Sequence, residues 1–257
     1  MKRGVYVSLI IVVLIFISIG SEYKCKSKDI DYKKYIRELI SEYNSDNYVI
    51  LEKIEDELKN KDSSVEEVGV NLLAREYFYS LSEQYDKLME ELYSTEKYLV
   101  TNNMYEELLA LYSIVMGKYD KVEEFNSAYI YAYKAEKTAS YIYEKSRNNE
   151  DLCNLISLKY IKAVIALEIG MENEADEAFN EAEELRKSFK IDNDQVYYYI
   201  LYYYKGKGNY EEVKKYANKI IELRNKEGWT YTYNKEWYTE VSIILARSYL
   251  KDGEIDK

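Results

Sequence analysis

The side chains of this chain that could do chemistry are chiefly tyrosines and carboxylates. The sequence has 32 tyrosines, 47 Asp and Glu residues and no histidine, so it lacks the commonest general acid/base and the commonest metal ligand. A hydrolase built from these residues would need a carboxylate pair or a lysine-activated nucleophile. Because no spacing singles out such a group, we expect no catalytic residue, no metal and no cofactor.

Two short motifs begin like ligand-binding loops but lack the rest of the signature. Gly206-Lys207-Gly208 has neither the spacing nor the downstream Lys-Ser/Thr of a phosphate-binding loop. Asp192-Asn193-Asp194 lacks the glycine and the distal glutamate of a calcium loop. Tyrosine, in contrast, offers a broad ring and a hydroxyl at small entropic cost, which suits the binding of a peptide or a sugar chain.

The charge of the chain argues against a nucleic-acid partner. Its formal net charge is −11, and an acidic surface repels phosphate backbones. The densest basic cluster, within residues 24–37, follows the apolar N-terminus, where it is better placed to meet lipid headgroups. We therefore expect a membrane contact and no nucleic acid.

Residues 4–21 are uncharged and mostly aliphatic, and they follow Lys2 and Arg3. As a helix they would span roughly 27 Å, close to the ~30 Å of a bilayer's hydrocarbon core. This length fits either a transmembrane anchor or a signal peptide, so residues 1–21 are predicted to be one or the other. Small residues at Ser18 and Gly20 would allow cleavage near Gly20, followed by secretion.

The processing and the sidedness of this segment stay open. Basic residues flank both of its ends, so the positive-inside rule gives no single orientation. We expect export, with the helical domain outside the cytoplasm of a bacterial cell. Cys25 stands where a lipidated cysteine could stand, but Glu22-Tyr23-Lys24 departs from the small residues that a lipoprotein signal requires. Cys153 falls in a helical pattern and is expected to be a small core residue.

The rest of the chain carries the periodicity of helical hairpins. Four glycines each close a run of helix-patterned apolar residues and are expected to mark turns: Gly117, Gly170, Gly208 and Gly253. The unit around Gly208 has apolar residues at i, i+3, i+4 and i+7 in residues 197–204, and again in residues 213–223. Two such helices cannot bury both apolar stripes alone, so neighbouring hairpins must stack.

These hairpins resemble the tetratricopeptide repeat (TPR) family. Its pattern has an apolar–small pair in the first helix, as at Leu109-Ala110 and Leu245-Ala246 here. The second helix carries Ala, an aromatic residue and Ala, as at Ala175, Phe179 and Ala182. The glycine spacings differ from the family's repeat of about 34 residues, and the chain has no proline, so longer helices are expected.

The resemblance implies an all-α fold, namely a TPR-like α-solenoid of antiparallel hairpins over residues 63–257, preceded by an N-terminal apolar helix. Residues 22–62 also have helical patterns and are expected to form a juxtamembrane hairpin that caps the array or spaces it from the membrane. In the TPR-like register, the inner groove would be lined by Tyr160, Gln195, Tyr198, Tyr202, Lys205, Glu240 and Arg247. Alternatively, the tyrosines pack between repeats in place of Leu or Phe.

The expected function is a non-enzymatic scaffold that binds a protein or a peptide. It would be membrane-anchored or exported and would act in bacterial envelope assembly or signalling. The alternative is an extracytoplasmic receptor that captures a small ligand, a glycan or a signalling peptide on the tyrosine-lined groove; a degenerate enzyme is a third class. We also expect self-association or partner docking through the C-terminal helix, whose face after Leu250 would be uncovered.

Overall fold

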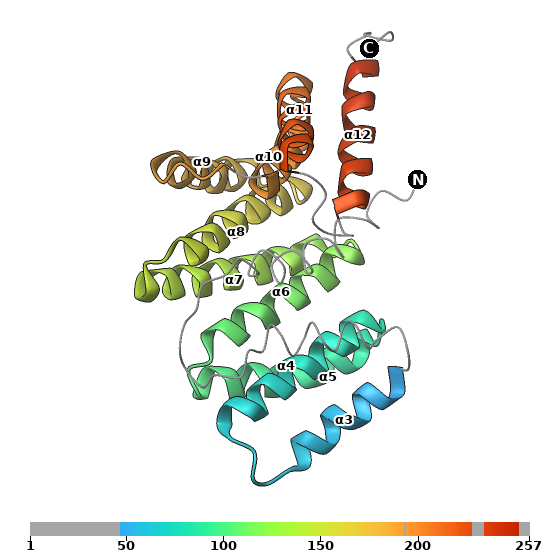
Figure 1. Cartoon of the computed structure of the whole chain (residues 1–257), viewed down its shortest axis with the longest axis vertical. Helices are drawn as coiled ribbons and strands as arrows, with labels where there is room; N and C mark the ends of the chain where they lie inside the picture. Colours follow the sequence, from blue (N-terminus) through green and yellow to red (C-terminus); the bar gives the residue numbers. More distant parts are fainter. Residues whose placement is uncertain (1–46, 193, 228–233, 252–257) are drawn as a thin grey trace. The chain divides into compact units, whose positions relative to one another are not determined.

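The structure is a computed structural model that describes residues 47–192, 194–227 and 234–251. These residues form ten helices and no strand, which confirms the all-α prediction (Figure 1). The helices are α3 (Asn47–Lys59), α4 (Val65–Leu81), α5 (Tyr85–Thr101), α6 (Tyr105–Lys121), α7 (Phe125–Ser146), α8 (Asn149–Glu168), α9 (Glu172–Ser188), α10 (Asp194–Gly206), α11 (Tyr210–Glu227) and α12 (Asn234–Lys251).

Several predictions for the ends of the chain fall outside the described residues. These are the anchor or signal segment of residues 1–21 with its apolar helix, the first part of the 22–62 hairpin, and the turn expected at Gly253. Within the residues that are described, no helix has the length and apolar character needed to cross a bilayer.

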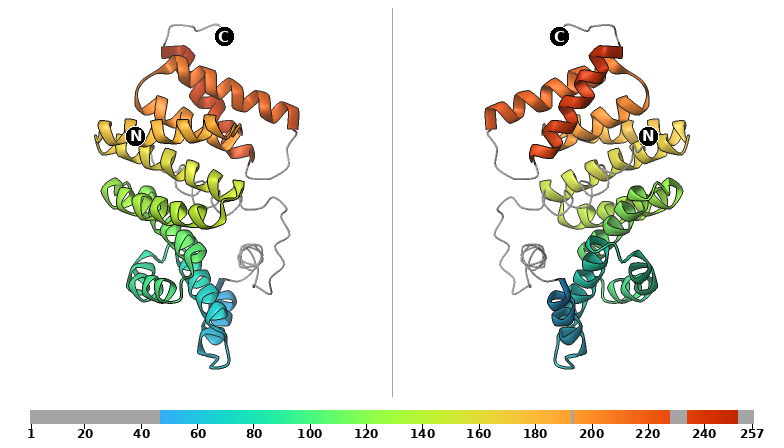
Figure 2. Two further views of the ribbon diagram at one scale, coloured as in Figure 1. Left: turned by 90° about the vertical axis from the view of Figure 1, so that its left-hand side faces the viewer. Right: turned by 90° about the vertical axis from the view of Figure 1, so that its right-hand side faces the viewer.

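The helices group into two compact units, Met1–Ser146 and Arg147–Lys257. In the first unit, α4 pairs with α5 and α6 pairs with α7, while α4 also packs on α6 and α3 packs on α4. In the second unit, α8 pairs with α9 and α10 with α11, α8 also packs on α10, and α12 packs on α11. Figure 2 shows the paired helices lying side by side within each unit. Each unit therefore stacks two consecutive hairpins through their first helices.

The turns after α4, α5, α6, α8, α9 and α10 share one backbone geometry. At Gly170 and Gly208 the glycine has a φ of 75° and 69°. The next residue then donates its N–H to a carbonyl five residues back, as from Met171 to Ala166 at 2.9 Å. This is the Schellman termination of a helix, which requires a residue in the left-handed region. The turns predicted at Gly170 and Gly208 are confirmed.

The other four of these turns have no glycine. Glu83, Asn103, Glu123 and Lys190 take the left-handed position, with φ between 56° and 61°. A non-glycine residue there costs roughly 1–2 kcal/mol, which the hydrogen bonds of the Schellman turn offset. The turn predicted at Gly117 is wrong: this glycine is buried inside α6, and the helix ends one turn later at Lys121.

First and second helices of the hairpins are buried differently. Residues 108–117 of α6 and 196–203 of α10 are buried without interruption, so every face of these first-helix segments is covered. The second helix α9 buries only one stripe, which includes the predicted Ala175, Phe179 and Ala182. The first helices thus form the core of each unit, and the second helices keep one face exposed. Cys153, expected in the core, is half-buried on α8.

Candidate functional site

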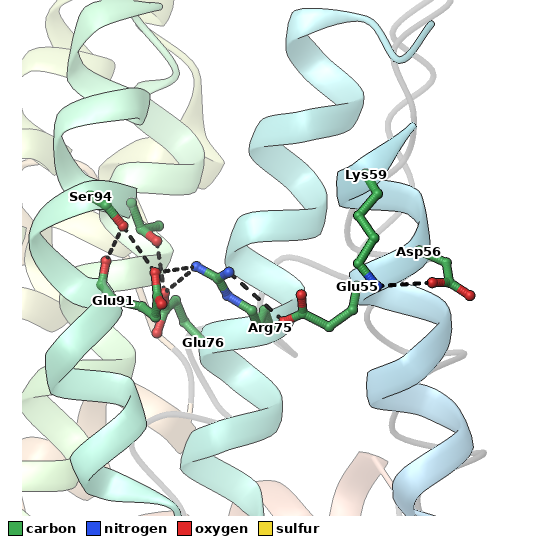
Figure 3. Close-up of polar contacts among 8 residues, drawn as sticks. Glu55, Asp56, Lys59, Arg75, Glu76, Glu91 and Ser94 are labelled. Carbon is green, nitrogen blue, oxygen red and sulfur yellow. Dashed lines mark hydrogen bonds and ion pairs between the residues drawn. The ribbon is translucent and has the colours of Figure 1, made fainter. Parts of the chain in front are cut away.

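Arg75, in the middle of α4, stands among glutamates from three helices. Its Nη2 lies 2.9 Å from Glu91 Oε2 on α5 and 3.6 Å from Glu76 Oε1 on α4 itself. Its Nη1 lies 3.9 Å from Glu55 Oε1 on α3. Figure 3 shows the guanidinium between these carboxylates. We call Glu55, Arg75, Glu76, Glu91 and Thr95 the Arg75 cluster; in it, one cation faces three acids.

Glu76 is the fully buried member of this cluster. The hydroxyl of Thr95 on α5 donates a hydrogen bond of 2.7 Å to Glu76 Oε1. Its second oxygen, Oε2, has no hydrogen-bond partner among the described residues. Burial raises the pKa of Glu76 to about 7, against the lowering effects of the Thr95 hydrogen bond and the Arg75 charge. This carboxyl therefore gains or loses its proton near neutral pH.

Local sequence features place these side chains. Ser64 and Glu67 form a capping box at the start of α4: Ser64 Oγ accepts from the Glu67 N–H at 3.2 Å, and Glu67 Oε2 accepts from the Ser64 N–H at 2.7 Å. On α5 the buried stripe is Leu88, Leu92, Thr95 and Leu99. A threonine thus occupies an apolar position and supplies the hydroxyl that a buried glutamate needs.

The second unit has its own buried glutamate, Glu183 on α9. Arg186 donates to both of its oxygens, from Nε at 2.8 Å and from Nη2 at 3.0 Å. The hydroxyl of Tyr160 on α8 donates to Oε1 at 2.5 Å, and the Lys187 ammonium lies 2.9 Å from Oε2. Burial raises the pKa of Glu183, but the hydrogen bonds from Arg186, Tyr160 and Lys187 outweigh it and hold this pKa at about 2. The carboxylate stays ionised and ties α8 to α9.

Tyr160, a predicted groove residue, therefore lies inside the second unit. Its ring is fully buried and packs edge-on against Phe179, with the ring centroids 5.5 Å apart. Burial, followed by the hydrogen bond to Glu183, raises the pKa of its hydroxyl. Its observed contacts are those of a packing residue.

Three more predicted groove residues meet between α10 and α12. The hydroxyl of Tyr198 donates to Glu240 Oε2 at 2.8 Å, and the hydroxyl of Tyr202 donates to Glu240 Oε1. Both rings are buried, with their centroids 4.8 Å apart, and Glu240 is half-buried. Burial, together with the charges of Tyr202 and Glu240, raises the pKa of Tyr198 well above its ordinary value. Here too the alternative interpretation, packing between repeats, describes the contacts.

The remaining predicted groove residues are more accessible. Lys205 is exposed, and its ammonium lies 4.3 Å from the centroid of the Tyr202 ring. Gln195 is half-buried on α10, and Arg247 is exposed on α12. The assignment of these three residues to a groove stays a prediction. In the part of the chain that is described, no group of three or more acidic or cysteine side chains is arranged to hold a metal ion.

The Arg75 cluster was missed by sequence reasoning, although two signals for it are present. Arg75 and Glu76 interrupt the otherwise apolar and small residues from Leu73 to Tyr79, and Thr95 interrupts the leucine stripe of α5. A polar residue within a buried stripe needs a hydrogen-bond partner, so the polar residues on α4 and the threonine on α5 could have been expected to contact each other.

Comparison with known proteins assigns the chain to no family. No protein-family profile matches it, and no curated protein matches it in sequence. The likeness to helical repeats therefore rests on the residues themselves and on the stacked hairpins of each unit.

Proposed function

We propose that this chain is a non-catalytic scaffold, a TPR-like α-solenoid whose stacked hairpins hold a protein or peptide partner. We place it in membrane-anchored or exported form in bacterial envelope assembly or signalling. The observation that supports this proposal most is the repeated stacking of hairpins through their first helices, α4 on α6 and α8 on α10. Arrays of this kind provide extended surfaces for binding other proteins.

The exposed side of α7 is the surface that best fits a partner. Ile130, Tyr133 and Tyr141 are 56%, 48% and 40% exposed there, although they are large apolar or aromatic residues. The ammonium of Lys137 lies 5.3 Å from the Tyr133 ring centroid, and that of Lys145 lies 5.4 Å from the Tyr141 ring centroid. We call these five residues the α7 face. Aromatic rings beside cations are frequent in the energetically important parts of protein interfaces.

A pull-down with matched variants tests this function. Purified full-length protein, incubated with membranes of its host, is expected to retain a defined protein partner. The double variant Tyr133→Ala/Tyr141→Ala should lose that partner with only a small loss of thermal stability, because both rings are exposed, although Tyr141 also packs against Tyr105 with ring centroids 4.4 Å apart. The control Tyr198→Phe/Tyr202→Phe removes only two buried hydroxyls and should keep the partner.

The receptor alternative predicts different outcomes in the same assay. If no protein is retained and a glycan or peptide array gives a specific ligand, the chain is a capture receptor. If the Tyr198→Phe/Tyr202→Phe variant then loses that ligand while remaining folded, the predicted groove is its binding site. Protease accessibility on intact cells, combined with the mass of the mature N-terminus, tests the proposed export and cleavage near Gly20.

We also propose self-association through α12. Val241, Ile244 and Ser248 are buried, and α12 packs on α11, whereas Ile243 and Leu250 are 46% and 59% exposed. Sedimentation velocity should show a concentration-dependent dimer for the wild type. Ile243→Ser/Leu250→Ser should sediment as a monomer; a wild type that stays monomeric at high concentration would contradict the proposal.

A further inference from the structure

The Arg75 cluster connects the first described helix of the chain to the hairpin that follows it. The Arg75 side chain belongs to α4, but its carboxylate neighbours belong to α3, α4 and α5. Its closest partner is Glu91 at 2.9 Å, whereas Glu76 at 3.6 Å and Glu55 at 3.9 Å lie beyond hydrogen-bond distance. The three acids therefore share a single guanidinium. A change of charge on one acid alters how strongly the guanidinium attracts the other two.

We propose that Glu76 is a proton switch that sets how firmly α3 is held against α4. With Glu76 protonated, the guanidinium of Arg75 remains between Glu91 and Glu55, and its contact with Glu55 attaches α3. With Glu76 ionised, a buried negative charge lies beside Arg75 and draws the guanidinium toward Glu76 Oε1. Its Nη1 then moves away from Glu55, and α3 loses its ionic contact with α4.

The surroundings of Glu76 make its ionisation consequential. The carboxyl is fully buried, and Oε2 has no hydrogen-bond partner among the described residues, so an ionised Glu76 has only Arg75 to move closer. A buried, incompletely paired carboxylate is costly, which favours this rearrangement. Two further acids face the Arg75 guanidinium from neighbouring helices, Glu55 on α3 and Glu91 on α5. Burial raises the pKa of the nearby Tyr79 on α4, which the charge of Arg75 lowers and the charges of the three glutamates raise.

The switch works in a useful pH range. Burial brings the pKa of Glu76 to about 7, so the carboxyl changes charge within the range that exported and cytoplasmic proteins meet. α3 would be held more firmly in mildly acidic surroundings and less firmly in mildly alkaline ones, while its buried Ile50 and Ile54 keep it packed at both.

Amide hydrogen exchange of the full-length protein tests this switch. Exchange rates of the α3 amides, corrected for the intrinsic effect of pH, are compared at pH 5.5 and pH 8.0. In the wild type, the α3 amides should lose protection at pH 8.0 by on the order of tenfold. This corresponds to a loss of about 1.4 kcal/mol in the free energy of local opening. Glu76→Gln should keep α3 protected at both pH values.

Two variants separate the switch from a general effect of pH. Glu55→Gln removes the contact on α3, so its α3 amides should exchange equally fast at both pH values, at the faster wild-type rate. Glu183→Gln changes a buried glutamate in the second unit and should retain the full wild-type pH difference in α3. Equal protection of wild-type α3 at both pH values would overturn the proposal, and so would a pH difference that survives Glu76→Gln.

A direct titration covers the case in which Glu76→Gln does not fold. The carboxyl carbon of Glu76, observed by NMR in the ¹³C-labelled wild-type protein, should titrate with a midpoint near pH 7. In the same titration, the amide signals of α3 should shift with the same midpoint. A Glu76 midpoint below pH 5, or α3 signals that do not follow it, would show that no such switch exists.

Discussion

Glu76 in the first unit and Glu183 in the second are both buried glutamates with an arginine nearby, yet their pKa values lie at about 7 and about 2. The difference follows from where the arginine stands on the helix. Arg75 is the neighbour of Glu76 in sequence, and adjacent residues on a helix do not face each other. Arg186 follows Glu183 by three residues, on the same helix face, and donates to both of its oxygens. The charge of a nearby arginine lowers both pKa values, but only the direct hydrogen bonds from Arg186, together with those from Tyr160 and Lys187, outweigh the effect of burial.

The number of competing acids widens the contrast. Arg75 is shared with Glu91 and Glu55, so the first unit has more negative than positive charge in its cluster. Glu183 accepts a hydrogen bond from Tyr160 and pairs with the Lys187 ammonium, in addition to its hydrogen bonds from Arg186. Glu183 thus stays ionised and links α8 to α9 above its pKa, whereas the charge of Glu76 changes near neutral pH.

The largest effect is expected from removing Glu183, whose two oxygens both accept hydrogen bonds. Glu183→Ala leaves Arg186 without its paired acid and the buried hydroxyl of Tyr160 without an acceptor. We expect the second unit to lose about 3–5 kcal/mol of unfolding free energy in urea denaturation, with exchange of the α9 amides assigning the loss to that unit. The control Glu184→Ala changes an exposed neighbour and should stay within about 0.5 kcal/mol of the wild type. A loss below about 1 kcal/mol for Glu183→Ala would mean that Glu183 is not a tie between helices.

The two glutamates should also give stability opposite dependences on pH. The folded-state pKa of Glu183 is lowered, so its contribution is present above pH 4.5 and is lost as the pH falls toward 2. The folded-state pKa of Glu76 is raised, so its effect on stability becomes unfavourable as the pH rises from 4.5 to about 7. At about 1.4 kcal/mol per pH unit, this second effect amounts to at most about 3 kcal/mol.

Urea denaturation at pH 5 and pH 8 measures the contribution of Glu76. Glu76→Gln, which cannot ionise, should gain stability relative to the wild type between these two pH values. Glu183→Gln should show no such gain, because Glu183 is ionised at both pH values in the folded and the unfolded chain. Parallel pH profiles for the wild type and Glu76→Gln would remove the distinction between the two clusters.

Periodicity in the sequence predicted the helices better than it predicted their surroundings. The turns at Gly170 and Gly208 were correctly predicted, because a turn that needs a positive φ favours glycine. The turns at residues such as Asn103 were missed, because the hydrogen bonds of the Schellman turn hold a non-glycine residue in the left-handed region. Gly117 was misread for the opposite reason, since a glycine inside a buried helix has no local signature.

The candidate sites were harder to predict, because burial is a property of the whole assembly of helices. In α10, apolar and aromatic residues occupy every face, so the sequence alone does not separate a groove tyrosine from a core tyrosine. The pair Arg75-Glu76 looks like an ordinary exposed charge pair until α3, α5 and α6 pack around α4. What could be predicted was set by neighbours along the chain, and what could not was set by neighbours across helices.

The smallest effect sharpens the comparison most, because it removes one donor from each cluster. Thr95→Val deletes the hydroxyl that donates to Glu76, and Tyr160→Phe deletes the one that donates to Glu183. Each should cost about 1 kcal/mol at a pH where the carboxylate is ionised. The pKa of Glu76 should rise from about 7, because the lowering effect of the Thr95 hydrogen bond is lost. The pKa of Glu183 should rise yet stay below 4.5, because Arg186 still holds both of its oxygens. NMR titration of the two carboxyl carbons distinguishes these outcomes: if Tyr160→Phe carried Glu183 above 4.5, the tyrosine and not the bidentate arginine would set the contrast between the two units.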